Sequence, residues 1–358
     1  QGVEVSRTRP YSLKAPDFAT EVLQLNVALL EKAMEVEREI GAMDLVHAHD
    51  WLTAPAARAL KHARRLPLIA TIHATEAGRN YGLHTDLQRY ISEVEWWLGY
   101  EAWRVICCSR YMKEEVRQIF QLPEDKIRVI PNGVEISNLK PAGELKRSDF
   151  AAPEEKIIFF VGRLVQEKGV QILLEAAKRV LSRHSQLKFI IGGDGSYRND
   201  LQNLARQLGI AEKVYFTGYL DEVRRNAFYA WAEIAVFPSL YEPFGIVALE
   251  AMAAQTPVIV ADTGGLGEIV THGLDGLKFY AGSSLSLAQM LLWLLADRKR
   301  GQNLAEQAYR KVKEQYNWRQ IARQTQKTYR EVWEESQNGF ASRLEKTNWR
   351  LPKNRNAH

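Results

Sequence analysis

Residues 156–174 read KIIFFVGRLVQEKGVQILL and contain a strand, a tight loop and the start of a helix. The first six residues form an apolar run rich in β-branched and aromatic side chains, which is typical of a buried strand. Beyond the loop, Val170, Leu173 and Leu174 recur at the spacing of one helix face. A strand that leads directly into an amphipathic helix is the repeating unit of a parallel sheet covered by helices. This stretch therefore predicts an α/β fold.

The same unit of strand and helix recurs in both directions along the chain. The sequence has 358 residues, and at about 100–200 residues per domain this length predicts two domains. The expected strands are residues 3–7, 44–49, 67–73, 104–108 and 127–131 in the first half, and 156–161, 187–191, 213–217, 233–237, 256–261 and 277–279 in the second.

A segment with two prolines, a glycine and mixed charges separates the two sets of strands, and we expect it to be the linker between the domains. Basic residues outnumber acidic ones in the last part of the chain, which is expected to be mobile, as chain termini often are. The expected division is an amino-terminal domain at 1–140, the linker at 141–155, a carboxy-terminal domain at 156–317, a late helix at 318–335 that packs back on the first domain, and a basic tail at 336–358.

The composition excludes several classes of protein. About 46% of the residues are apolar and 25% are charged, which is typical of globular domains and not of disordered or fibrous chains. The net charge is +5, and residues 337–358 hold five basic residues against one acidic residue, so the charge does not indicate a nucleic-acid-binding protein. The most apolar helical run, residues 285–296, is shorter than the roughly 20 residues that cross a membrane.

Cysteine usage and missing motifs narrow the chemistry. Cys107 and Cys108 are neighbours on an expected strand and point to opposite faces, so they predict neither a disulfide nor a zinc site. With no secretion signal at the start of the sequence, this favours a cytoplasmic protein. The sequence lacks Gly-Lys-Ser/Thr phosphate loops, His-Glu-x-x-His, Gly-x-Ser-x-Gly and Asp-x-Asp. Cations and helix ends would then neutralise any leaving group, which predicts a reaction that uses neither a metal nor a cofactor.

Polar and glycine-rich residues follow nearly every expected strand. Ligands of open α/β sheets bind outside the carboxyl ends of the strands. Because both halves of the chain contribute such residues, we predict a cleft between two facing sheets. In chain order these strand ends are residues 47–50 (HAHD), 71–73 (TIH), Ser109, 132–133 (NG), 162–163 (GR), 192–195 (GGDG), 218–219 (GY), 238–239 (PS) and 262–265 (DTGG).

Two cations flank the loop that follows residues 156–161. Gly162 and Arg163 begin this loop and Lys168 lies near its end, so two positive charges can meet the charge of a diphosphate. The alternative is that Arg163 forms a surface salt bridge with Glu167.

The Gly-Gly-Asp-Gly turn at 192–195 would let the backbone at Gly193 and Asp194 approach a ligand closely. It is not a full dinucleotide fingerprint, because Arg198 stands where a third glycine is expected. The alternative is a tight turn between a strand and a helix that touches no ligand.

Residues 241–254, YEPFGIVALEAMAA, contain two glutamates and a possible helix start. A helix that begins near Gly245 and Ile246 presents free backbone N–H groups, which bind anions. Glu250 would lie one turn into this helix on its apolar face, where a carboxylate needs hydrogen-bond donors. Ribose hydroxyls would supply them, while Glu242, outside the helix, could reach a transferred sugar. The alternative for Glu250 is a solvated helix face.

His73 ends an apolar strand, and His49 and Asp50 end the strand before it. A histidine at such a position can touch a ligand in the cleft. The alternative for all three residues is a purely structural role.

Together these residues resemble the retaining glycosyltransferases of family 4, which have the two-domain GT-B fold. The Glu-x7-Glu element at Glu242 and Glu250 is the most specific match, and the matches extend along nearly the whole chain up to Trp333. The resemblance implies two facing Rossmann-like domains with parallel sheets and an interdomain cleft. The other matching motifs, in the family's order, are Pro-Asn-Gly at 131–133, Gly-Arg at 162–163 with Lys168, Gly-Gly-Asp at 192–194 and Thr-Gly-Tyr at 217–219.

Within this family, HDW at 49–51 and TIH at 71–73 are similar to glycogen and starch synthases, and HATEAGRN at 73–80 resembles bacterial enzymes of α-glucan metabolism. The resemblance implies transfer of glucose from ADP-glucose or UDP-glucose, with retention at the anomeric carbon, to an α-glucan or a small sugar. It implies no further cofactor and no metal. The candidates on the acceptor side are His49, Asp50, Glu76 and Arg79.

The resemblance also implies roles for single residues. Arg163 and Lys168 would hold the diphosphate and stabilise the charge that develops on the leaving group. His73 would contact the donor sugar near the anomeric carbon, and Glu242 would bind its hydroxyls. Closure of the two domains would exclude water. The catalytic candidates are therefore His73, Glu242, Arg163 and Lys168.

On the donor side, Glu250 would bind the ribose, and Tyr219 and Leu220 would lie beside the nucleobase. The amides near Gly245 and Ile246 would assist in holding the diphosphate. The donor-binding candidates are Gly162, Gly193, Asp194, Tyr219, Leu220, Gly245, Ile246 and Glu250.

One departure from the family concerns the start of the sequence. Family members begin with a strand and a Gly-Gly loop, and neither precedes Val3. We therefore expect several amino-terminal elements to be missing, and weaker activity than that of a longer chain that includes them. Equal turnover by the two would contradict this expectation.

Three other functions fit parts of the sequence. A non-catalytic glucan- or nucleotide-binding protein could stack sugars on Trp97, because Trp96, Tyr100 and Trp103 follow the spacing of a buried stripe. The presence of His73 together with Arg163, Lys168 and Glu250 favours catalysis instead, because a protein that only binds would not require all four. A glucan phosphorylase would need a motif for a pyridoxal-phosphate lysine, which the sequence lacks.

The third is a membrane-associated glycolipid transferase. A basic amphipathic helix can bind a membrane surface, and the sequence predicts one such helix. The apolar face of this helix is mostly alanine, so a solvated basic helix fits the pattern better. The helix carries Arg58, Lys61, Arg64 and Arg65 together with Leu60 and Leu66.

Overall fold

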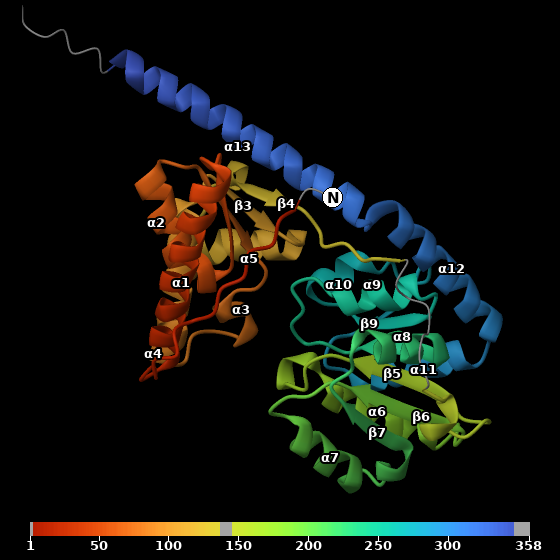
Figure 1. Ribbon diagram of the computed structural model, residues 1–358. Coiled ribbons are helices and arrows are strands. Elements are labelled where there is room, and N and C mark those ends of the chain that lie inside the picture. The colour runs from red at the N-terminus through yellow and green to blue at the C-terminus, as the bar shows by residue number, and fades with distance from the viewer. Residues whose placement is uncertain (1–2, 137–144, 347–358) are drawn as a thin grey trace, which may run out of the picture.

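The computed structural model describes residues 3–136 and 145–346, with side chains described up to residue 338. Figure 1 shows two lobes, each built from a sheet covered by helices, with the long helix α13 (Trp318–Lys346) running from one lobe to the other. The two sheets lie in residues 46–129 and 156–279.

The first sheet has four parallel strands in the order β1-β2-β3-β4. All four lie inside the ranges that the hydrophobic pattern predicts. The strands are β1 (Val46–His49), β2 (Leu68–Ile72), β3 (Arg104–Cys107) and β4 (Ile127–Val129). The helices of this lobe are α1 (Phe18–Ile40), α2 (Ala54–Arg64), α3 (Glu76–Arg79), α4 (Asp86–Glu101) and α5 (Arg110–Phe120).

The second sheet has six parallel strands in the order β10-β9-β8-β5-β6-β7. Strand order reverses between β5 and β8, and ligands of such sheets bind in the crevice at this point. The strands are β5 (Lys156–Val161), β6 (Leu187–Gly192), β7 (Val214–Gly218), β8 (Ala232–Phe237), β9 (Val258–Ala261) and β10 (Leu277–Phe279). The helices are α6 (Val170–Leu181), α7 (Arg198–Gln207), α8 (Glu222–Trp231), α9 (Ile246–Ala253), α10 (Gly264–Ile269), α11 (Ser284–Leu295) and α12 (Arg298–Gln315).

The expected strand at residues 3–7 is wrong. The described residues of this segment form no strand, and Val3 and Val5 are 86% and 65% exposed. An alternating pattern predicts a strand only where a neighbouring strand offers hydrogen bonds and a core covers the apolar face. The segment has neither in this structure.

Helix α13 continues beyond the predicted end at residue 335 and reaches Lys346. The expected mobile tail at 336–358 is therefore wrong for residues 336–346, and residues 347–358 lie outside the described part of the chain. The second half of this extension contains Ala341, Arg343, Leu344, Glu345 and Lys346, which are good helix formers. The apolar side chains of α13 pack on the first sheet, where Ile321 and Val332 join the core that holds Ile69.

The apolar face of the basic helix α2 packs into the first lobe. Leu60 is buried, and three of the basic side chains are ion-paired: Arg58 and Lys61 with Glu101 at 3.0 and 2.6 Å, and Arg64 with Glu37 at 2.7 Å. No helix among the described residues is long and apolar enough to cross a membrane.

The expected burial of the aromatic stripe on α4 is also wrong. Trp96 and Tyr100 are 46% and 64% exposed and stack on each other, whereas Trp97 packs against the core. The face of α4 that is buried carries Ile91 and Leu98 instead. Spacing alone marks residues that share a helix face, but it does not tell which face meets the sheet.

The two lobes contact each other beside the cleft. Ser109, directly after β3, donates a hydrogen bond to the carbonyl oxygen of Pro243 at 2.6 Å. Glu268 in α10 accepts the backbone N–H groups of Arg110 and Tyr111 at 3.0 and 2.6 Å, at the start of α5. These contacts fix the loop after β8 against the first lobe, so residues of both lobes face one cavity.

Candidate active site

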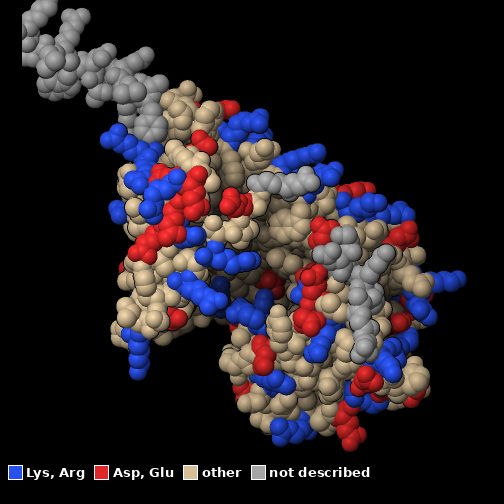
Figure 2. Space-filling view, in the orientation of Figure 1, with Lys and Arg blue, Asp and Glu red and all other residues tan. Residues whose placement is uncertain are grey.

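A cavity of about 360 Å³ lies between the two lobes, within the size range of small-molecule sites. Figure 2 shows a hollow at this place, with Lys and Arg side chains around its rim. The residues that line it are His73, Ala74, Arg79, Cys108, Asn132, Phe160, Val161, Gly162, Arg163, Glu167, Lys168, Phe237, Ser239, Tyr241, Glu242, Pro243, Phe244, Gly245, Ile246 and Val247. Eight predicted site residues are among them, from both lobes.

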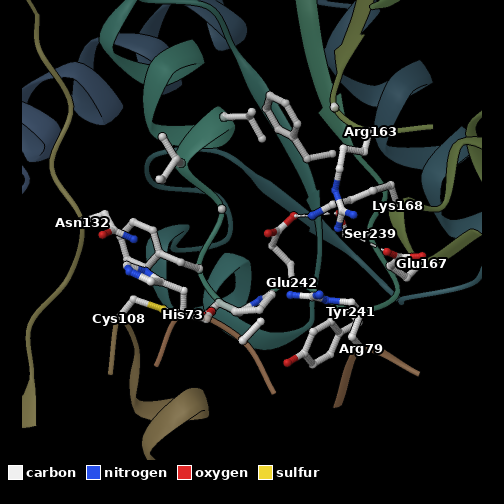
Figure 3. Close-up of a pocket in the computed structure, with 18 of the residues that line it drawn as sticks. His73, Arg79, Cys108, Asn132, Arg163, Glu167, Lys168, Ser239, Tyr241 and Glu242 are labelled. Carbon is white, nitrogen blue, oxygen red and sulfur yellow. Dashed lines mark hydrogen bonds and ion pairs between the residues drawn. The ribbon is translucent and has the colours of Figure 1, made fainter. Parts of the chain in front are cut away.

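Lys168 and Glu242 meet inside this cavity, as Figure 3 shows. The Lys168 Nζ lies 2.7 Å from Glu242 Oε2, and the Ser239 hydroxyl donates to the same oxygen at 3.1 Å. Both bonds use Oε2, and within the described residues no hydrogen bond to Oε1 is present. The cavity therefore offers a held ammonium group and a carboxylate oxygen to a ligand.

Close packing of two loops brings these residues together. Gly169 has φ 69°, and a Cβ at this position would lie 1.9 Å from the carbonyl oxygen of Pro238. The Leu240 N–H also donates to the Glu167 carbonyl at 2.8 Å. Because no side chain separates the loop after β5 from the loop after β8, Lys168 reaches the carboxylate of Glu242.

Arg163 lies at the rim of the cavity. It forms the surface salt bridge with Glu167 that was the alternative to binding a diphosphate. Its guanidinium is 3.4 Å from Glu167, and the side chain is 61% exposed. An exposed pair at this spacing contributes only about 0–1 kcal/mol, so an incoming anion can replace Glu167 at little cost.

The helix expected near Gly245 is present as α9. Gly245 caps it with φ 107° and provides no side chain, and Gly245, Ile246 and Val247 line the cavity. The first N–H groups of α9 have no side-chain cap, so the positive end of the helix dipole faces the same space as Lys168.

Glu250 does not line this cavity, and side chains of its own lobe bind its carboxylate, so its need for donors does not by itself indicate a ligand; its contact with a ribose stays a prediction. Arg225 Nη2 lies 3.0 Å from Glu250 Oε1, and the Tyr229 hydroxyl donates to Oε2 at 3.1 Å. Burial raises the pKa of Glu250. The hydrogen-bond donors that a buried carboxylate requires come from α8 of the same lobe.

The Gly-Gly-Asp-Gly turn packs strands together and does not line the cavity. A Cβ on Gly193, which has φ 117°, would lie 1.9 Å from the carbonyl oxygen of Gly162. Asp194 accepts the Gly195 N–H at 2.8 Å and pairs with Arg198 at 3.2 Å. The alternative of a tight turn therefore accounts for this geometry.

The side chains of Tyr219 and Leu220 have different surroundings in the structure. Leu220 is only 6% exposed and packs in the core against Gly192, so its expected place on a binding surface is wrong. Tyr219 is 80% exposed at the end of β7, and its contact with a nucleobase stays a prediction.

On the first lobe, three predicted residues meet behind the cavity. His49 Nδ1 lies 3.0 Å from His73 Nε2 with the two ring planes nearly parallel, while Asp50 Oδ1 accepts the backbone N–H of His73 at 2.8 Å. Asp50 has φ 57° and ψ 175°, a region that residues other than glycine adopt at a cost of about 1–3 kcal/mol. Of the three only His73 lines the cavity, so His49 and Asp50 support it from behind.

The acceptor-side candidates Glu76 and Arg79 lie on the short helix α3, and Arg79 lines the cavity. A residue that the sequence patterns miss, Glu95 in α4, holds this helix by accepting the Glu76 N–H at 3.0 and 3.1 Å. The pKa of Glu95 is raised to about 8, chiefly by burial and to a smaller extent by the nearby carboxylates of Glu76 and Asp50. The helical spacing of α4 could have placed Glu95 on the buried face, beside Ile91 and Leu98.

Glu95→Gln should change how stability depends on pH. Folded Glu95 binds its proton more tightly than the unfolded chain does, so wild-type stability should fall as pH rises from about 4.5 through 8. By the usual conversion the loss amounts to about 3–5 kcal/mol. The variant keeps a neutral acceptor for the Glu76 N–H, so it should unfold at higher denaturant than the wild type at pH 9 and at a similar concentration at pH 5.

The matched control is Glu93→Gln, which changes an exposed glutamate on the same helix. Parallel pH profiles for the wild type and Glu95→Gln would contradict the prediction.

Tyr241 and Cys108 also line the cavity, and neither was predicted as a site residue. The Tyr241 hydroxyl donates to Glu115 Oε1 at 2.9 Å, so this side chain bridges the lobes, and Cys108 is a buried free thiol. Tyr241 precedes Glu242 directly, and this adjacency is the one signal that could have found it. Among the described residues, no group of three or more His, Cys, Asp or Glu side chains could hold a metal ion.

Comparison with known proteins assigns both lobes to the same kind of enzyme. The family described as Glycosyltransferase Family 4 matches residues 7–138, and the family Glycosyl transferases group 1 matches residues 143–311. The chain is 39% identical over 340 residues to an uncharacterised glycosyltransferase of Methanocaldococcus jannaschii, which covers 92% of this chain and 85% of that protein. It is 37% identical over 287 residues to a glycogen synthase of Mycobacterium tuberculosis, which covers 80% and 68%.

A solved structure shows the same fold. Sucrose-phosphate synthase from Thermosynechococcus elongatus superposes with a TM-score of 0.80 at 24% identity, over 93% of this chain and 86% of that one. Two parallel α/β sheets face each other across one cavity, and each half of the sequence matches a glycosyltransferase family. The chain therefore belongs to the glycosyltransferases of the GT-B fold, with the family 4 and group 1 domains in its two lobes.

Proposed function

We propose that this glycosyltransferase is a retaining enzyme that moves glucose from a nucleoside diphosphate to an α-glucan or a small sugar acceptor, without a metal ion. Retention and the identity of the sugar rest on the resemblance of its motifs to family 4. The name of the Mycobacterium tuberculosis relative, a glycogen synthase at 37% identity, supports glucose and a glucan acceptor.

The observation that carries the proposal is the contact between Lys168 and Glu242 in the cavity. The Lys168 ammonium has three N–H donors, one of which binds Glu242 at 2.7 Å, so the others are available to phosphate oxygens. Arg163 at the rim and the start of α9 add positive charge to the same space. A diphosphate is the leaving group that such a charge arrangement would stabilise.

The sugar would occupy the space between this phosphate grip and the first lobe. Glu242 Oε1 would accept hydrogen bonds from the donor sugar's hydroxyls, while His73 would contact the sugar near the anomeric carbon. In the reaction the bond between the anomeric carbon and the diphosphate oxygen breaks, and the acceptor hydroxyl oxygen bonds to that carbon. The hydroxyl proton leaves with the diphosphate, which the cations keep in place.

The acceptor would approach from the first lobe, where Arg79 lines the cavity and Glu76, His49 and Asp50 lie behind it. We propose that the donor is ADP-glucose or UDP-glucose and that the protein acts in the cytoplasm. Roles for Gly162, Gly193, Asp194, Tyr219 and Glu250 at the nucleotide end remain part of this proposal.

The test is release of nucleoside diphosphate from ADP-glucose, UDP-glucose and GDP-mannose, each with and without glycogen or maltose, and each with and without EDTA. We expect release from a glucose donor that depends on the acceptor and is unchanged by EDTA, and a product whose new linkage is α by proton NMR. A β linkage would contradict retention, and loss of turnover in EDTA would contradict metal independence.

A non-catalytic binding protein of the same fold is the remaining alternative. It would bind the nucleotide, as calorimetry would show, but release no diphosphate with any acceptor. A mannose donor used with a lipid acceptor would instead favour a glycolipid transferase.

A further inference from the structure

A row of aromatic rings leads from the cavity to helix α13. His47 and His49 share one face of β1 because they lie two residues apart in a strand. The ring centroids of His47 and His49 are 4.4 Å apart, and those of His49 and His73 are 5.3 Å apart. Tyr329 of α13 closes the row, with its ring 5.5 Å from that of His47. His73 at the other end lines the cavity.

Hydrogen bonds hold His47 on both sides. Its Nδ1 lies 2.6 Å from the Tyr329 hydroxyl and its Nε2 lies 2.8 Å from the Thr71 hydroxyl. Burial lowers the pKa of His47 to about 3, with a smaller effect from His49 and His73, so this ring is neutral at physiological pH. Burial also raises the pKa of Tyr329, whose hydroxyl keeps its proton. A neutral imidazole has one donor and one acceptor, and these two hydroxyls occupy both.

The contact between His49 and His73 restricts both rings as well. Two imidazole nitrogens 3.0 Å apart need one proton between them, so one ring donates and the other accepts. Burial and the neighbouring His73 lower the pKa of His49, while Asp50 opposes this shift. The row therefore binds His73 through one defined ring nitrogen.

Helix α13 supplies a rigid end for this row. Ile321 and Val332 of α13 pack with Ile69, Ile106 and Ile130 of the first lobe, on both sides of Tyr329 in sequence. The position of the Tyr329 hydroxyl is thus set by packing that does not involve the cavity. A side chain that lines a cavity is otherwise free to change rotamer, and a misplaced reacting group is costly in rate.

We propose that Tyr329, His47 and His49 are positioning residues that set the orientation of the His73 ring at the sugar end of the cavity. The proposal rests on the proposed function for the role of His73, while the ring contacts do not depend on it. It assigns to α13, which lies outside the cavity, a defined contribution to catalysis.

A double-mutant cycle tests this coupling. Tyr329→Phe keeps the ring but removes the hydroxyl. This substitution is introduced into the wild type and into His73→Ala. For each protein, kcat and KM for the donor are measured by release of nucleoside diphosphate. We expect Tyr329→Phe to lower kcat about tenfold, within the range of coupling between residues linked through direct contacts, and to leave KM within about twofold. In His73→Ala it should have no further effect. An equal loss of kcat in both backgrounds would overturn the proposal.

A second measurement does not need activity. The side-chain nitrogens of the histidines are observed by ¹⁵N NMR in the wild type, in Tyr329→Phe and in the control Tyr309→Phe, which changes a tyrosine on α12. We expect the signals of His47, His49 and His73 to shift together in Tyr329→Phe and to stay in place in the control. A shift confined to His47 would overturn the positioning row. Joint shifts in a protein that transfers no sugar would instead leave the row intact and contradict the proposed function.

Discussion

Lys168→Ala should lower kcat for sugar transfer by about 10²- to 10³-fold, the loss that follows removal of one preorganised group from a developing charge. The Lys168 ammonium lies 2.7 Å from Glu242 in the cavity, and its side chain is mostly buried. Its removal takes a fixed positive charge from the leaving diphosphate and leaves the Glu242 carboxylate, among the described residues, with Ser239 as its remaining side-chain partner. Both effects act on the transition state more than on the bound donor, so kcat should fall more than KM rises.

The measurement is release of nucleoside diphosphate under saturating donor, with thermal unfolding of each variant recorded alongside. Lys178→Ala, which removes an exposed lysine from α6, is the matched control and should retain wild-type kcat. Glu242→Gln separates the two effects, because it keeps a hydrogen-bond acceptor for Lys168 while removing the negative charge. Activity of Lys168→Ala within threefold of wild type would show that this cation does not stabilise the leaving group.

Gly193→Ala should destabilise the protein by about 3 kcal/mol or more, which is large for a single substitution. Gly193 has φ 117°, where an alanine is strained, and its added Cβ would lie 1.9 Å from the Gly162 carbonyl oxygen. The clash involves backbone on both sides, so only separation of the ends of β5 and β6 relieves it. The loop that carries Arg163 starts at this point and should move with it.

The matched control is Gly209→Ala. Gly209 has φ 71°, but nothing lies within 4 Å of a Cβ built on it, so this variant measures the cost of conformation alone, about 1–2 kcal/mol. Chemical denaturation of both variants gives the difference that arises from the clash. Equal destabilisation of the two variants would show that the ends of β5 and β6 move apart without lowering the free energy of unfolding. This result would contradict the packing role assigned to Gly193.

Most strands were predictable because each is a short apolar run bounded by turn residues. The runs at β5 and β10 were located to the residue. The segment at residues 3–7 has the same alternation but no partner strand, and a pattern in sequence does not report whether a partner is present.

The candidate site was predictable where a residue's role follows from its place beside a strand end. Lys168, Glu242 and His73 all follow strands, and the topology of parallel sheets brings strand ends to one edge. The partners of Glu250 could not be predicted because Arg225 and Tyr229 lie on α8, a contact that only packing of two helices creates. Leu220 follows a strand as Tyr219 does, yet one enters the core and the other faces solvent.

The sequence by itself determined the α/β class, the positions of ten strands, the helix start at Gly245 and the family, because these depend on local periodicity, turn residues and motif spacing. Only the tertiary structure decided which charges pair, that Gly193 serves packing, that Glu95 holds α3 and that Tyr329 reaches His47. Such contacts join residues up to 282 positions apart. They arise when helices and loops settle against the sheets, and no local pattern in the chain encodes the partner of a side chain on a distant element.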